Sequence, residues 1–256
     1  MKVLFVGNSF SRDTVQHLGK IAKNVGLTDF CFANLYIGGC SVRRHFRNVS
    51  ENLADYTYSR TTNGDWDEGR KASVADALAE GPWDLICIQH GTGDQSRYTA
   101  AESYDHLPHL IEYIRKTHGT SVKIGFNMTW IGEPESPKSP ELRNVYGNDQ
   151  LAMYRAVAKL TEQLVLPLVD FVSPAGTAIQ NLRTCLDKPL TRDTYHLSYD
   201  LGRFAAGLTF LKTVLGISLE PLFWSPEGVS EEERELAKRA AELAVKTPFA
   251  VTNMNG

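Results

Sequence analysis

The sequence contains no long hydrophobic run. No window approaches the roughly 20 apolar residues that a membrane-spanning helix needs. The apolar run near the start, Val3–Val6, is too short for the core of a signal peptide, and it ends in Gly7-Asn8 without a small-residue cleavage site. We therefore expect a cytoplasmic protein with no membrane partner, whose first strand follows directly on the initiating methionine.

Cysteine is scarce, and its spacing excludes the common metal motifs. The four cysteines form no CxxC pair; they are Cys31, Cys40, Cys87 and Cys185. This spacing argues against a structural zinc site. His106 and His109 share one helical face, but no cysteine or carboxylate pair accompanies them. We interpret both histidines as surface residues and predict no metal and no other cofactor.

Neither a strongly basic segment nor a low-complexity tract is present. The chain has 27 Lys and Arg against 30 Asp and Glu, so no nucleic-acid partner is expected. No internal repeat or Pro/Ser-rich linker divides the 256 residues, a length that suits one large α/β domain. We predict a single domain over residues 1–256, in which residues 219–256 form a C-terminal appendage packed on the rest. The oligomeric state cannot be read from the sequence.

Short apolar runs alternate with amphipathic segments along the chain. Such runs are typical of central parallel strands, and the segments between them have helical spacing. The predicted strands are Lys2–Val6, Phe30–Ile37, Leu85–Gln89, Val122–Met128 and Leu168–Val172. The predicted helices cover about residues 15–25, 73–80, 101–117, 148–164, 174–183, 199–215 and 231–245. This alternation predicts a three-layer α/β/α sandwich with a five-stranded, mostly parallel sheet.

The stretch between the second and third predicted strands is less regular. Tyr56–Arg60 and Trp66 flank Asn63-Gly64, a pair that favours a tight turn. We predict a small hairpin there, in addition to the five strands.

Polar and glycine-rich segments follow the predicted strands. Ligands bind open parallel sheets at the carboxyl ends of the strands, so these segments are expected to converge on a site. They are Gly7–Phe10, Gly38–Ser41, Gln89–Asp94 and, in a late loop, Thr191–Ser198. Trp66 and Trp130 either form an aromatic side of this site or pack in the core or a lid.

Ser9 stands between the first strand and the first helix. A hydroxyl there can point out of the sheet, beside the N–H groups of a helix N-terminus, which bind a developing oxyanion. The position also suits a plain helix N-cap. Asp193 and His196 favour the catalytic interpretation, because a nucleophilic serine needs a base and the base needs an orienting carboxylate.

These segments resemble the sequence blocks of the SGNH (GDSL-like) hydrolases. Gly7–Phe10 is similar to the first block, Gly39 lies where the second-block glycine donates its N–H, and Asp193–Ser198 is similar to the DxxHLS fifth block. Ala77-Leu78 followed by Trp83–Gln89 resembles the DUF4886 branch of that superfamily. The resemblance spans about residues 2–215. It implies a flavodoxin-like SGNH hydrolase fold with a Ser9, His196 and Asp193 triad.

Two positions depart from the family pattern. Asn8 stands where the first block has aspartate, at a position that shapes the turn and is not the nucleophile. The third block usually supplies an asparagine to the oxyanion, but Gly91–Asp94 has Gly93 at that place. Gln89 is the expected substitute, because its amide offers the same N–H chemistry on a longer stem.

The resemblance implies an esterase acting on short acyl, above all acetyl, oxygen esters, such as those of carbohydrates. The expected oxyanion donors are the N–H groups of Ser9 and Gly39 and the amide of Gln89; if Gln89 is only structural, Gln95 or His90 takes its place. The expected partner is a small-molecule or oligosaccharide ester. Two other functions stay open: a thioesterase or lipase for longer acyl chains, and a non-catalytic carbohydrate-binding protein of the same fold.

Overall fold

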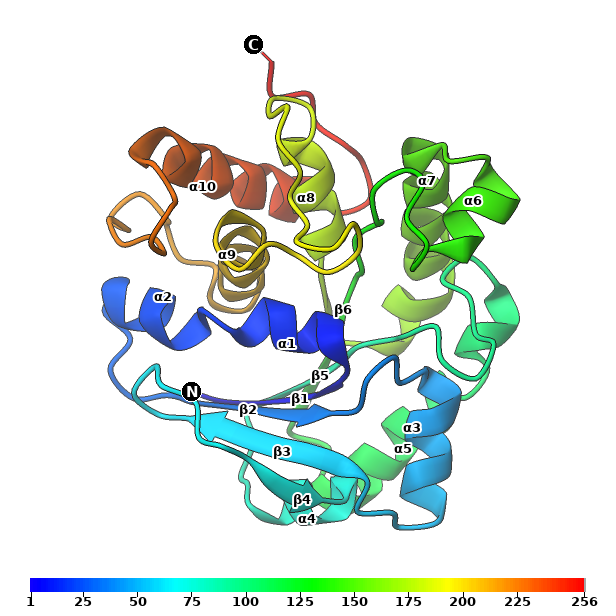
Figure 1. Cartoon of the computed structure of the whole chain (residues 1–256). Helices are drawn as coiled ribbons and strands as arrows, with labels where there is room; N and C mark the ends of the chain where they lie inside the picture. Colours follow the sequence, from blue (N-terminus) through cyan, green and yellow to red (C-terminus); the bar gives the residue numbers. More distant parts are fainter. Residues whose placement is uncertain (256) are drawn as a thin grey trace.

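A seven-stranded sheet with helices on both faces forms the centre of the molecule (Figure 1). The computed structural model describes residues 1–255. The strands are β1 (Lys2–Gly7), β2 (Cys31–Tyr36), β3 (Tyr56–Thr61), β4 (Arg70–Ala72), β5 (Leu85–Ile88), β6 (Lys123–Asn127) and β7 (Phe171–Ser173). Their order across the sheet is β4-β3-β2-β1-β5-β6-β7.

Five of these strands are parallel and correspond to the five apolar runs of the sequence. β1 is central and pairs with β2 on one side and β5 on the other; Val3 lies opposite both Phe32 and Leu85. β6 and β7 continue the parallel arrangement beyond β5. Residues Val3–Val6 are fully buried because helices cover both faces of the sheet at β1. The predicted α/β class is confirmed.

The predicted number of strands is wrong, because the hairpin extends the sheet. β3 pairs with β2 and β4 pairs with β3, both antiparallel, so the sheet is mixed. Tyr56 and Tyr58 are buried while Thr57 between them is exposed, the alternation of a strand with one covered face. Such a pattern indicates a strand but does not show which other strand it pairs with. The return strand is Arg70–Ala72, beyond the position of Trp66.

Helices cover the two faces of the sheet unequally (Figure 1). One face carries α1 (Ser9–Val15), α2 (Leu18–Asn24), α8 (Ala175–Leu182), α9 (Leu201–Leu215) and α10 (Glu231–Lys246). The other carries α3 (Val42–Ser50), α4 (Val74–Ala79) and α5 (Leu107–His118), and α6 (Pro140–Tyr146) and α7 (Gln150–Leu160) lie on the right of Figure 1. Short 3-10 or π turns occupy Ala101–Tyr104, Thr161–Val165 and Leu166–Leu168. Of the ten α-helices within residues 1–255, α3 and α6 were not predicted, and the single helix predicted over about residues 15–25 is replaced by two, α1 and α2.

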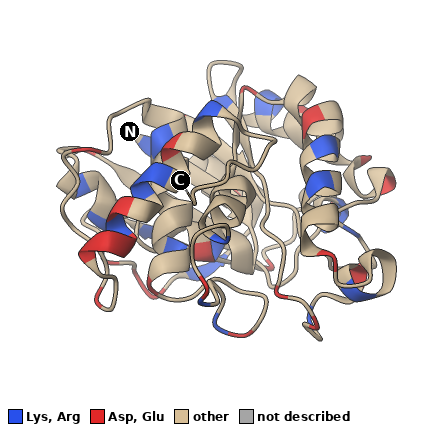
Figure 2. Ribbon diagram, turned by 90° about the horizontal axis from the view of Figure 1, so that it is seen from above, with Lys and Arg blue, Asp and Glu red and all other residues tan. Residues whose placement is uncertain are grey.

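Charged residues of both signs lie side by side in the view of Figure 2. In Figure 2, Lys and Arg alternate with Asp and Glu along the same helices, as on α10. Across residues 1–255, no helix combines the length and the apolar character needed to cross a membrane.

Candidate active site

The turn after β1 presents the Ser9 side chain at the carboxyl end of the central strand. Asn8 is the N-cap of α1: its side-chain oxygen accepts from the Phe10 N–H at 2.9 Å. The Asn8 amide also donates to the carbonyl of Cys40 at 3.1 Å, which ties this turn to the loop after β2. Because Asn8 caps the helix, the Ser9 hydroxyl is free for another partner. That partner comes from the other end of the chain.

His196 and Asp193 meet Ser9 in one chain of hydrogen bonds. His196 Nε2 lies 2.9 Å from Ser9 Oγ, and His196 Nδ1 lies 2.8 Å from Asp193 Oδ2. An ionised carboxylate can only accept, so Nδ1 carries the proton and Nε2 is left to accept from the serine hydroxyl. The side chains of His196 and Asp193 are 20% and 30% exposed, so the site is open to a ligand.

Asp193 is held in its ionised form. Burial raises the pKa of its carboxyl, but hydrogen bonds from Lys138 and His196 outweigh burial, and the net pKa lies well below the usual range. Lys138 donates to Oδ2, the oxygen that also accepts from the imidazole. The other oxygen accepts from the backbone N–H of His196 at 2.7 Å. The carboxylate therefore orients the imidazole from both of its oxygens.

A buried carboxylate, Asp13, ties the histidine loop to the serine helix. Asp13 lies one turn after Ser9 on α1 and is fully buried. Its Oδ2 accepts from the Leu197 N–H at 2.9 Å, directly after His196. Its Oδ1 accepts from Arg192 at 3.0 Å and from Arg203 Nε at 2.8 Å. The sequence reasoning missed this residue; its only signal was an acid one helical turn from the serine.

The loop after β5 packs on the glycine that follows β2. Gly39 has a φ of +64°, and its carbonyl accepts from the N–H of Gly93 at 2.7 Å. A side chain at Gly93 would meet the Gly39 carbonyl oxygen at 2.5 Å, and one at Gly91 would meet the Cys40 carbonyl oxygen at 2.5 Å. This close approach explains why glycine stands at the place where an asparagine was expected.

The expected placement of the Gln89 amide is wrong. Gln89 is fully buried, its side-chain oxygen accepts from the Asn127 amide at 2.6 Å, and its own amide donates to the His90 carbonyl at 3.3 Å. Asn127 in turn donates to Thr14 at 3.0 Å, so this chain of amides lies beneath α1. Gln89 follows β5 beside the ends of β1 and β6, and its side chain fills the space between the sheet and the helix. It does not border the space above Ser9.

The alternatives named for Gln89 lie elsewhere as well. His90 is buried; its Nδ1 accepts from the Val42 N–H at 3.3 Å, and burial lowers its pKa to about 4. Gln95 borders a neighbouring cavity. Trp130 is fully buried and stacks on Phe10 at 4.2 Å between ring centroids, which is a core role.

A cavity of about 450 Å³ lies over Ser9. Ser9, His196 and Gly39 border it, as do Lys138 and Thr92. Gly91 and Thr92 are the residues of the 89–95 loop that border this cavity, and of the two only Thr92 has a side chain. The Thr92 side chain also forms a hydrogen bond with Tyr195. Within residues 1–255, no group of three His, Cys, Asp or Glu side chains could hold a metal ion.

Comparison with known proteins identifies the family. The model of a domain of unknown function, DUF4886, matches residues 2–244. The chain belongs to the DUF4886 family. The crystal structure of a DUF4886 family protein from Bacteroides uniformis is 30% identical, covers 99% of this chain and 98% of its own, and superposes with a TM-score of 0.92. No curated protein matches the chain.

More distant solved structures share the fold of the DUF4886 protein. A member of the lipolytic protein G-D-S-L family from Veillonella parvula is 14% identical, covers 85% of this chain and all of its own, and has a TM-score of 0.55. A Slackia heliotrinireducens protein assigned to the SGNH hydrolases is 20% identical, covers 83% and 98% of the two chains, and has a TM-score of 0.53. The fold is that of the SGNH hydrolases.

Proposed function

We propose that this DUF4886 protein is a serine esterase that hydrolyses short acyl oxygen esters through an acyl-enzyme on Ser9. The observation that carries the proposal is the hydrogen-bonded chain Ser9–His196–Asp193 at the carboxyl end of the central strand, bordering an open cavity. The nucleophile, the base and the group that orients the base are within hydrogen-bonding distance of one another, as acyl transfer requires.

In the first half of the reaction, Ser9 Oγ attacks the ester carbonyl carbon and its proton passes to His196 Nε2. Asp193 holds the Nδ1 proton and stabilises the imidazolium. When the tetrahedral intermediate collapses, the bond from carbon to the alcohol oxygen breaks and His196 returns the proton to that oxygen. In the second half, His196 takes a proton from water, the resulting oxygen attacks the acyl carbon, and Ser9 leaves with the proton.

The oxyanion is bound by backbone amides and one hydroxyl. Ser9 is the first residue of α1, so its N–H has no acceptor inside the helix and is available to a ligand. Gly39 borders the same cavity and supplies the second N–H. We assign the third donor to the Thr92 hydroxyl, in place of Gln89, because it is the side chain that the third-block loop offers to this cavity.

Short acyl groups, such as acetyl groups on carbohydrates, are the substrates we favour over long chains. Tyr36 borders both the Ser9 cavity and a neighbouring hollow. This hollow has a volume of only about 100 Å³, and its lining is rich in polar side chains such as Asn34 and Asp67. A long apolar chain would find little room in this hollow and would remove its polar lining from water. A thioesterase or lipase is therefore the less favoured alternative.

Replacement of Ser9 by alanine tests the proposal. A fluorophosphonate probe should label the wild-type protein at Ser9, and the wild type should release acetate from simple acetyl esters. Ser9→Ala should retain its far-UV circular dichroism and lose turnover by a factor on the order of 10⁶. A folded Ser9→Ala variant with activity within tenfold of wild type would rule out the serine mechanism. A wild type that is neither labelled nor active would favour the non-catalytic binding protein.

A further inference from the structure

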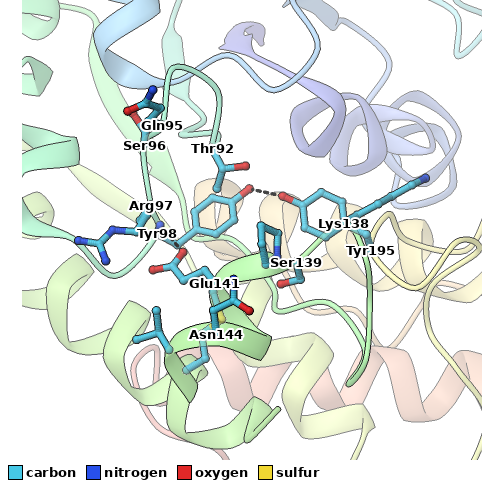
Figure 3. A pocket seen from close by; sticks show the side chains of 13 residues that line it. Thr92, Gln95, Ser96, Arg97, Tyr98, Lys138, Ser139, Glu141, Asn144 and Tyr195 are labelled. Carbon is cyan, nitrogen blue, oxygen red and sulfur yellow. Dashed lines mark hydrogen bonds between the residues drawn. The ribbon is translucent and has the colours of Figure 1, made fainter. Parts of the chain in front are cut away.

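A second cavity, of about 300 Å³, adjoins the one over Ser9 (Figure 3). Four residues border both cavities: Thr92, Tyr98, Lys138 and Tyr195. Figure 3 shows the hydroxyls of Tyr98 and Tyr195 directed at one another, and they lie 3.0 Å apart. These two phenols hold the boundary between the cavities in place. A ligand on Ser9 that extends along these shared residues would enter the second cavity.

The second cavity lies on the histidine side of the site. Tyr195 directly precedes His196, and Lys138 contacts Asp193. In acyl transfer, the alcohol oxygen must lie beside His196 Nε2, which protonates it, while the carbonyl oxygen faces the amides of Ser9 and Gly39. The alcohol half of an ester is therefore directed toward Tyr195 and Lys138, and the acyl half toward the opposite side.

The charged residues around this cavity are paired within the protein. Lys138 contacts Asp193, and Arg97 pairs with Glu102 at 3.3 Å. The Glu141 carboxylate accepts from the backbone N–H of Tyr98 at 2.9 Å, from that of Thr99 at 3.0 Å and from the Thr99 hydroxyl. Each charged side chain of the lining has a partner, so the cavity does not favour a ligand with a net charge of either sign.

The remaining lining combines apolar surface with neutral polar groups. Pro140, Val145 and Met153 supply apolar contacts, and Gln95, Ser139 and Asn144 supply amides and hydroxyls. Val145 is 53% exposed and lies at the rim. A ring with apolar faces and hydroxyls along its edge matches this mixture. The volume is at the lower end of the range for small-molecule sites, about 300–1,000 Å³, which suits one ring.

We propose that this cavity binds the alcohol half of the ester, as a single neutral, hydroxyl-rich ring of the size of one sugar residue. The proposal rests on the proposed esterase function. It assigns the specificity of the enzyme for its alcohol to residues 139–145 and the loop around Gln95, which do not contact the triad.

Two series of esters separate the alcohol half from the acyl half. One series keeps the acetyl group and changes the alcohol: ethyl acetate, a mono-acetylated neutral monosaccharide, a mono-acetylated sugar acid, and acetylcholine. The other keeps ethanol and lengthens the acyl chain from acetyl to hexanoyl. The variants are Val145→Trp, which fills the rim, and Asn144→Ala, which removes an amide. Leu164→Trp places the same ring on an exposed position that borders neither cavity.

The wild type should prefer the neutral acetylated monosaccharide to the other three acetates. The specificity ratio is kcat/KM for that sugar ester divided by kcat/KM for ethyl acetate. Val145→Trp should lower this ratio by about tenfold or more. Asn144→Ala should lower it by about 3- to 10-fold, which corresponds to the loss of one hydrogen bond. Leu164→Trp should leave the ratio unchanged, and no variant should change the acyl-length preference.

Two results would overturn the assignment while leaving the esterase proposal standing. In the first, Val145→Trp changes the preference among the esters of the acyl series and not among those of the alcohol series. This result would mean that the cavity holds the acyl group. In the second, the active wild type prefers a charged acetate by tenfold or more over the neutral sugar ester. Absence of labelling at Ser9 together with inactivity on every ester would overturn both proposals.

Discussion

Asp13 is the residue whose replacement tests the architecture of the site most directly. Its carboxylate is fully buried and accepts from Leu197, Arg192 and Arg203. In the wild type, one carboxylate oxygen faces Leu197 and the other faces the two arginines. In Asp13→Asn the side-chain amide has a single oxygen, so it can accept on only one of these sides. If that oxygen faces the two arginines, the amide nitrogen faces the Leu197 N–H, and two donors meet beside His196. Breaking a buried ion pair by removing one partner costs about 3–5 kcal/mol.

Loss of this free energy should be visible in thermal unfolding. For a chain of this size, 1 kcal/mol corresponds to roughly 2–4 °C, so Asp13→Asn should unfold roughly 6–20 °C below the wild type. At a temperature where the variant is fully folded, kcat should fall tenfold or more with little change in KM, because a displacement of His196 by about 1 Å can cost up to 10²-fold. Circular dichroism melts and steady-state kinetics on an acetyl ester measure the two effects.

A surface pair provides the control for Asp13. Glu112→Gln removes a carboxylate that pairs with Lys116 on α5, where both side chains are exposed, and it should change neither Tm nor kcat. The reasoning is refuted if Asp13→Asn melts and turns over like the wild type. An unchanged kcat in a destabilised variant would refute the link to His196 alone, and would leave Asp13 with a purely structural role.

Three further predictions follow from the site and the core. Thr92→Val should lower kcat by about 10² at similar KM, while Thr92→Ser should keep most of the rate. Equal kcat values in the wild type and both variants would show that the Thr92 hydroxyl does not bind the oxyanion, and that the backbone amides alone do. Lys138→Met removes a hydrogen bond that lowers the pKa of Asp193. A lowered carboxyl pKa stabilises the folded state fully at pH values above the pKa of the unfolded chain, and this stabilisation is lost as the pH falls toward the folded-state pKa. This variant should therefore be less stable than wild type at pH 7 in urea titrations, and the difference should shrink as the pH is lowered below about 4. A difference that grows on acidification would contradict the pairing. Burial raises the pKa of Cys40 to about 12 and that of Cys87 further, so iodoacetamide at pH 8 should label neither in the folded protein, and labelling as fast as in urea would show that these thiols are accessible.

The local patterns of the sequence determined the class of the fold and the residues that meet at its site. The parallel strands are apolar on both faces, and this can be read without knowing their neighbours. Ser9 could be identified because a strand, a turn and a helix follow one another along the chain. Asp193 and His196 are three residues apart in one loop, so their mutual contact depends on local geometry.

Only the tertiary structure decided which way side chains point where separate segments meet. The sequence placed Gln89 at the end of a strand, but the space beside Asn127 decided that its amide turns beneath α1. Successive side chains of a strand point to opposite faces, so position along the chain does not reveal which one reaches a site. Asp13 contacts residues about 180 positions away, and the hairpin could join the sheet only at an edge that β2 left open. These outcomes depend on packing between distant elements, which the sequence encodes only through the whole fold.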